Sequence, residues 1–129
     1  MSDLFAWSTF VGDISGWNVS NVVDMHNMFA NSQFDGDISE WNVSKVMNMR
    51  YMFWNSKFDG DLSKWDTSNV RYMRGMFYSS VFSGDISNWN TNKVEDMDYM
   101  FEISPLEGKE PEWYCKNLDD VMRYRGEWS

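Results

Sequence analysis

The sequence predicts an α/β repeat protein, a short solenoid of stacked 24-residue strand–turn–short-helix units that ends in a C-terminal helical cap. Three observations support this. Gly-Asp recurs every 24 residues, beginning at Gly12, Gly36, Gly60 and Gly84. Within each unit, apolar residues first alternate with other residues and then follow helical spacing. After the last unit the pattern changes to one helical stripe, which indicates a different closing element.

The four copies align without a gap, and their leading residues are Phe10, Phe34, Phe58 and Phe82. Numbered from this Phe, ten of the 24 columns are identical: Phe (first), Gly-Asp (third and fourth), Ser (sixth), Trp (eighth), Val (thirteenth), Met (sixteenth), Met-Phe (nineteenth and twentieth) and Ser (twenty-third). We divide the 129 residues, as a single domain, into a partial repeat (1–9), four repeats (10–105) and the cap (106–129).

Each unit begins with an expected strand and ends with an expected helix. In the second copy, residues 34–38 alternate with period 2, which predicts a short strand with Phe34 and Ile38 facing inward. Trp41 and a polar turn follow. Met49, Met52 and Phe53 then lie on one face of a helical turn. Because one unit cannot bury this apolar face alone, we expect the units to stack and the identical columns to form the core.

The cap is expected beyond Phe101, where we take the repeat pattern to stop. Pro111 suits the first turn of a helix. Tyr114, Leu118, Val121 and Met122 follow at helical spacing and form one apolar stripe. Such a terminal element covers the apolar end of a stack.

Composition and charge exclude several classes of function. The net charge of −9 argues against direct binding to nucleic acid or to an anionic membrane, although it permits a basic partner. Cys115 is the single cysteine, so neither an intramolecular disulfide nor a Cys-rich zinc site is expected. No apolar stretch is long enough for membrane insertion. The N-terminus lacks a signal peptide, which predicts a cytoplasmic location if the chain is native and complete.

The unit "F-x-G-D-I-S-x-W-N-V-S-x-V-x-x-M-x-x-M-F" resembles the repeats of the BspA-like leucine-rich-repeat surface proteins, in their mycoplasma-type variant. The resemblance covers about residues 10–104, with a partial unit in residues 1–9. It implies a leucine-rich-repeat-like solenoid and a role in binding or adhesion at bacterial or viral surfaces. It implies a cell or virion surface as the location, and it carries no catalytic residues to transfer.

The polar columns predict turns more readily than chemistry. Aspartates recur in the fourth column, and we expect each to accept backbone hydrogen bonds in a turn; their spacing matches no known calcium loop. The ninth column, with Asn or Asp, is interpreted in the same way. His26 is the single histidine and has no partner for a zinc site or a nucleophilic pair. We therefore expect no enzyme activity, no catalytic residue, no metal and no cofactor.

If the identical columns form the core, the variable columns carry the candidate surface. Arginine, tyrosine and tryptophan, the usual hot-spot residue types, gather in the central repeats. The candidate binding residues are Arg50, Tyr51, Trp54, Arg71, Tyr72, Arg74, Tyr78 and Tyr99. The fourth repeat adds a candidate acidic patch of Glu95, Asp96, Asp98 and Glu102. The alternative is that Trp54 and Tyr78 simply pack between neighbouring units.

Three classes of function remain open. The first is a protein-binding module used for recognition or adhesion, and it is preferred. The second is a viral or phage-type inhibitor that binds a host protein inside the cell through an acidic surface. The third is a structural subunit that self-associates end to end through exposed repeat faces. The sequence does not identify the partner.

Overall fold

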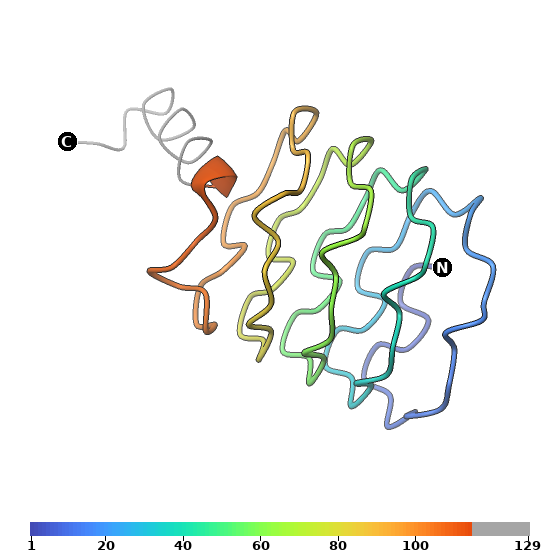
Figure 1. Ribbon diagram of the computed structural model, residues 1–129. Coiled ribbons are helices and arrows are strands. Elements are labelled where there is room, and N and C mark those ends of the chain that lie inside the picture. Colours follow the sequence, from blue (N-terminus) through green and yellow to red (C-terminus); the bar gives the residue numbers. More distant parts are fainter. Residues whose placement is uncertain (115–129) are drawn as a thin grey trace.

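The repeats form successive turns of one coil that lie side by side along the molecule. The computed structural model describes residues 1–114 (Figure 1). Each turn runs in the same direction as its neighbours, because isolated parallel bridges join Asp24 to Asn48, Asn48 to Tyr72 and Tyr72 to Asp96. These four residues occupy the fifteenth column of successive repeats. The 24-residue period is therefore also the period of the stack.

The predicted α/β solenoid of strand–turn–short-helix units, including its leucine-rich-repeat-like form, is wrong. Among residues 1–114, only residues 112–114 are helical, and β-pairing is limited to the isolated bridges. The described repeats contain neither a helix nor a sheet. They are built from consecutive tight turns, and the stack depends on contacts between turns.

The segment predicted as a helix from about Met49 is a series of turns with alternating backbone handedness. Tyr51 and Asn55 have left-handed φ angles of 55° and 51°, which interrupt any right-handed helix. Met52 N donates to the Met49 carbonyl only three residues earlier, at 3.2 Å. Tyr51 N donates instead to the carbonyl of Arg74 in the next repeat, at 2.8 Å. Because alternate N–H groups are used between repeats, the helical i to i−4 pattern cannot form.

The segment predicted as a strand, residues 34–38, makes no β-bridge. Phe34 N donates to the Ser32 hydroxyl at 3.0 Å, so a side chain takes the place of a strand partner. The Phe34 ring folds over Gly36, where an added Cβ would lie 2.7 Å from the ring. The predicted inward orientation is nevertheless right, because Phe34 and Ile38 are both buried.

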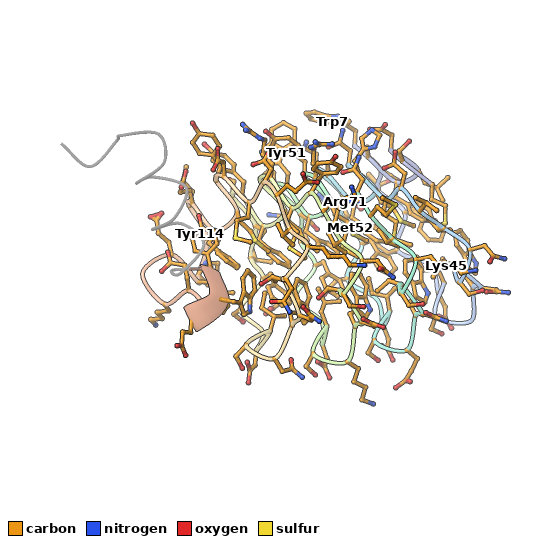
Figure 2. The ribbon with its side chains drawn as sticks, turned by 90° about the horizontal axis from the view of Figure 1, so that it is seen from above. Trp7, Lys45, Tyr51, Met52, Arg71 and Tyr114 are labelled. Atoms are coloured by element: carbon orange, nitrogen blue, oxygen red, sulfur yellow. The ribbon has the colours of Figure 1, made fainter. Side chains whose placement is uncertain are left out.

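The identical apolar columns form the core, as predicted. Phe53 stacks on Phe77 with ring centroids 5.6 Å apart and the rings nearly parallel. Trp65 is buried, and its indole N–H donates to the Ile38 carbonyl of the preceding repeat at 2.9 Å. Met52 lies inside the stack among these rings (Figure 2). Each column therefore runs through the molecule as a continuous row of one residue type, and such rows hold neighbouring repeats together.

The repeat pattern continues past Phe101, where we expected it to stop. Trp113 lies 24 residues after Trp89 and stacks on it, with ring centroids 6.3 Å apart. Its indole N–H donates to the Ile86 carbonyl at 2.9 Å, the same bond that the earlier tryptophans make. Tyr114 is buried against Phe101. The C-terminal end of the described stack is thus covered by a fifth tryptophan in register.

The predicted cap of residues 106–129 is described only in part. Tyr114 N donates to the Pro111 carbonyl, and helical residues begin at 112. Cys115, Leu118, Val121 and Met122 lie outside the described residues. The division of the chain into partial repeat, four repeats and cap stays a prediction.

Candidate functional site

Four of the predicted binding residues come together in one surface pocket. Tyr51, Trp54, Tyr78 and Tyr99 line a pocket of about 240 Å³, which we name the aromatic pocket. They come from the second, third and fourth repeats and occupy the eighteenth and twenty-first columns. The stacking of repeats places side chains that are distant in sequence beside one another.

A glycine in the third repeat lets the pocket form. The eighteenth column reads Tyr51, Gly75 and Tyr99 in successive repeats, and all three residues have left-handed backbone angles. The Tyr51 ring lies across Gly75, where an added Cβ would be 2.3 Å from a ring carbon. A larger residue at Gly75 would push this ring away. Glycine in place of a tyrosine at position 75 therefore leaves room for the Tyr51 ring, which forms one wall of the pocket.

Trp7, which the sequence reasoning missed, extends the aromatic surface toward the N-terminus. Its side chain is 75% exposed and meets Trp54 edge-on, with ring centroids 6.5 Å apart. Trp7 and Tyr51 lie along the same edge of the stack (Figure 2). We call Trp7 and the four pocket residues the aromatic strip. The signal was available, since Trp7 occupies the twenty-second column, where the four full repeats have Asn31, Asn55, Ser79 and Ile103.

The predicted arginines are engaged within the molecule. Arg50 places its guanidinium carbon 3.9 Å from the centroid of the Tyr72 ring. Arg74 donates from Nε to Asp96 at 2.8 Å and from a terminal nitrogen to Asp98 at 3.4 Å. The bond to Asp96, together with the nearby carboxylate charges, raises the pKa of Arg74 above its already high value. Two of the predicted acidic residues thus neutralise one of the predicted basic residues.

The other two acidic residues differ in their surroundings. Glu95 lies 3.9 Å from an Arg71 nitrogen, and both side chains are exposed, so this pair contributes little stability. Glu102 follows Trp54 and Tyr78 in the twenty-first column. Burial raises the pKa of Glu102, and the charges of Glu107, Asp98 and Glu110 raise it further. Negative charge therefore accumulates around Glu102, one repeat after the pocket residue Tyr78.

Arg71 lies away from the aromatic pocket, in a second groove that the sequence did not predict. The groove has a volume of about 360 Å³ and is lined by Val23, Lys45, Met47, Asn69, Arg71 and Lys93. Lys45 donates to Asn21 and Lys93 donates to Asn69, each at 3.0 Å. Amide oxygens hold these ammonium groups in place but do not cancel their charge. Most cations of this groove come from the twelfth column, which the sequence reasoning passed over.

The repeated aspartates serve in turns, as predicted. Asp37 accepts hydrogen bonds from the backbone N–H of Ser39 at 2.9 Å and from its hydroxyl at 2.7 Å. Asp13, Asp61 and Asp85 accept the equivalent backbone bond in their own repeats. Among the residues that the structure describes, no three His, Cys, Asp or Glu side chains are grouped as a metal site.

His26 sits between two carboxylates near the N-terminal end. Its Nδ1 lies 2.7 Å from Asp24 and its Nε2 lies 3.5 Å from Asp3. Burial raises the pKa of Asp24, but the hydrogen bonds and charge of His26 outweigh this and leave it lowered. The contact between His26 and Asp3 joins the first full repeat to the partial repeat.

Within residues 1–114, no helix has the length and hydrophobicity that crossing a membrane requires. A search of the curated proteins and a search of the solved structures find no similar chain. A family model described as "Mycoplasma protein of unknown function, DUF285" matches residues 1–121, which supports the resemblance at the level of the family. The match spans the whole stack, with its partial first repeat and the in-register Trp113. The chain therefore belongs to this Mycoplasma repeat family, DUF285.

Proposed function

We propose that the protein is a non-catalytic repeat module that binds a protein partner through the aromatic strip. The observation that carries this is the contrast between two sets of aromatic residues. Core rings such as Phe53 are fully buried, whereas Trp7 and Tyr99 are mostly exposed and their neighbours line an open pocket. Clustered tyrosine and tryptophan on a surface are typical of binding hot spots.

The stack supports such a site because its backbone is held in place. Tyr51 N donates to Arg74 O, and Asn55 N donates to Tyr78 O, so the backbone beneath the strip is hydrogen-bonded from repeat to repeat. A rigid scaffold reduces the entropy lost when the side chains are ordered by a partner. Residues in variable columns can change without disturbing the identical columns of the core.

The resemblance adds two finer elements to this proposal. The mycoplasma-type repeat motif is associated with adhesion, so we propose recognition of a partner at a cell or virion surface. The alternative setting is the cytoplasm, and the localisation of the tagged protein in its native cell separates the two.

The test is to recover partners with the folded protein by cross-linking and to compare two double variants. Trp54→Ala with Tyr78→Ala removes two walls of the aromatic pocket. Glu40→Ala with Lys64→Ala removes an exposed ion pair outside the strip and is the matched control. We expect the first variant to lose the recovered partner and the control to keep it. If the pocket variant keeps both its fold and the partner, the aromatic strip is not the binding surface.

A second candidate is a viral or phage-type inhibitor that uses the acidic surface to bind a basic host protein. The negative charge around Glu102 favours it, because the charges of Glu107, Asp98 and Glu110 add to burial in raising the pKa of Glu102. This candidate predicts that Glu102→Gln with Glu107→Gln weakens the partner complex and that added salt weakens it strongly. Salt-insensitive binding that depends on Trp54 favours the first proposal instead.

A further inference from the structure

The walls of the aromatic pocket present ring faces and edges in two tilted pairs. Tyr51 and Trp54 have ring centroids 5.9 Å apart and planes 63° apart. Tyr78 and Tyr99 have centroids 6.4 Å apart and planes 82° apart. These four residues line the pocket, which is open to solvent, so every wall that a bound group would touch is aromatic. A group that enters it would contact several rings at once.

The quadrupole of an aromatic ring makes its face attractive to cations. A guanidinium group suits such a site better than a primary ammonium, because it is planar and more weakly hydrated. The protein already contains this interaction nearby, since the Arg50 guanidinium lies 3.9 Å from the Tyr72 ring centroid. Arg74 lies 6.0 Å from the Tyr99 ring centroid, although its charge is paired with Asp96 and Asp98.

The charge around the pocket also favours a cation. Glu102 takes the place in the fourth repeat that Tyr78 has in the third, and its backbone carbonyl accepts a hydrogen bond from Ser79 N. Burial raises the pKa of Glu102, and the charges of Glu107, Asp98 and Glu110 raise it further. The chain as a whole carries a formal charge of −9. A cationic group that entered the aromatic pocket would lower this repulsion.

We propose that the aromatic pocket binds the guanidinium group of an arginine side chain on the protein partner. This inference rests on the proposed function and names the group that the partner presents. The rings of Tyr51, Trp54, Tyr78 and Tyr99 contact the guanidinium, and the carboxylate of Glu102, which follows Tyr78 in the same column, supplies the opposite charge. The partner's arginine is the anchor of the interface in the sense of a hot spot.

Short peptides test the inference without the partner. The probe is acetyl-Gly-Arg-Gly-amide, titrated into the isotopically labelled protein while chemical shifts are followed by NMR. The comparison peptides replace arginine by citrulline, which keeps the shape without the charge, by lysine and by trimethyllysine. We expect shift changes centred on the four pocket residues with the arginine peptide and at least five-fold weaker binding of the other three peptides. Tighter binding of trimethyllysine would overturn the assignment to arginine, and equal binding of citrulline would overturn the role of charge.

Variants of the pocket complete the test. Trp54→Leu keeps an apolar side chain but removes a ring face, so it should abolish binding of the arginine peptide. Val81→Leu, on the surface outside the pocket, is the control and should leave binding unchanged. Shift changes that persist in Trp54→Leu would place the peptide elsewhere. If the arginine peptide fails to bind while Trp54→Ala with Tyr78→Ala still loses the recovered partner, this inference falls and the proposed function stands. If that double variant keeps the partner, the proposed function falls whatever the peptide does.

Discussion

Tyr51 has a backbone conformation that tyrosine rarely adopts, and its column explains why. The residues at the eighteenth column are Asp3, Asn27, Tyr51, Gly75 and Tyr99, and all five have positive φ angles of 55° to 60°. Glycine, asparagine and aspartate tolerate this conformation best. The two tyrosines adopt it because the inter-repeat hydrogen bonds fix the backbone around them.

The first prediction concerns Gly75. Gly75→Ala places a Cβ where the Tyr51 ring now lies, so we expect the ring to move away from Trp54 and the pocket wall to be lost. The free energy of unfolding should fall by about 1–2 kcal/mol, from the left-handed alanine and from the displaced ring. Loss of the nuclear Overhauser contacts between Tyr51 and Trp54 measures the movement.

Gly108→Ala is the matched control for this change. Gly108 also has a positive φ, but an added Cβ would meet no atom within 4 Å. Its substitution should show the backbone effect alone and leave the aromatic pocket unchanged. Ring contacts between Tyr51 and Trp54 that survive in Gly75→Ala would contradict the role of Gly75 as the floor beneath Tyr51.

The second prediction concerns the pH dependence of stability. The hydroxyl and backbone N–H of Ser39 lower the pKa of Asp37 below 3.8, and the aspartates Asp13, Asp61 and Asp85 are lowered in the same way. A lowered folded-state pKa stabilises the protein above the unfolded pKa, and this contribution is lost as pH falls through the folded value. The urea midpoint should therefore decrease between about pH 5 and about pH 2.

Asp37→Asn removes the titrating charge but keeps an acceptor for the hydrogen bond that holds the turn. Asparagine keeps an oxygen acceptor for Ser39 N but does not titrate in this range. We expect the slope of the urea midpoint against pH to become shallower in this variant, with little change near neutral pH. An unchanged slope would mean that the repeated aspartates do not couple to folding.

At the scale of the repeat element, the sequence predicted the period and the buried columns but not the local conformation. Residues 49–53 carry Met and Phe at a spacing that helices share with turns of alternating handedness. Hydrophobic periodicity predicts which side chains are buried. It does not predict which carbonyl groups accept hydrogen bonds from the backbone N–H groups. Asn27 and Gly75 share the eighteenth column, and both residue types tolerate the left-handed conformation of a turn. This pattern is visible only when the copies are aligned.

The third prediction concerns the tryptophan column of the repeat. Trp65 is buried and donates to the Ile38 carbonyl, so Trp65→Ala should lower the free energy of unfolding by about 3–5 kcal/mol. Trp65→Phe keeps a smaller aromatic ring and leaves this carbonyl without its donor, and the lost hydrogen bond alone costs about 1–3 kcal/mol. Urea unfolding followed by circular dichroism measures both changes.

Trp17 is the control within the same column. Its side chain is 42% exposed, at the N-terminal end of the stack. Trp17→Ala should lower the free energy of unfolding by no more than about 1.5 kcal/mol, in proportion to the smaller apolar area it buries. Equal effects at Trp17 and Trp65 would show that the column does not stabilise the stack by burial between repeats.

At the scale of the whole molecule, the two ends of the described stack differ. Trp113 and Tyr114 cover the last aromatic rings, whereas Phe10, Val11 and Trp17 are exposed at the N-terminal end. The sequence predicted that central tyrosines and tryptophans would form a surface, and four of them do meet in the aromatic pocket. It did not predict Trp7, because tryptophan occurs once in the twenty-second column, and it did not predict the Lys45 groove, because lysine is a common surface residue.

The fourth prediction tests self-association of the 129-residue chain. The exposed apolar end gives a second copy of the chain a surface to bind. We expect the mean mass in sedimentation to rise with concentration and Val11→Lys with Trp17→Lys to abolish the rise. Val81→Lys changes an exposed valine elsewhere and should leave the rise intact. A constant mass in the unchanged chain would exclude assembly through this end.

The alternating turns also give one edge of the stack a net dipole. Met49, Tyr51, Phe53 and Asn55 all donate their N–H groups toward the following repeat, and Met25, Asn27, Phe29 and Asn31 do the same one repeat earlier. Peptide dipoles aligned in this way add, as they do along a helix. The aligned row therefore leaves a partial negative charge at the first turn of this edge and a partial positive charge at its last turn. A partner that binds along this edge can therefore distinguish one end of the stack from the other, even where the repeats are identical.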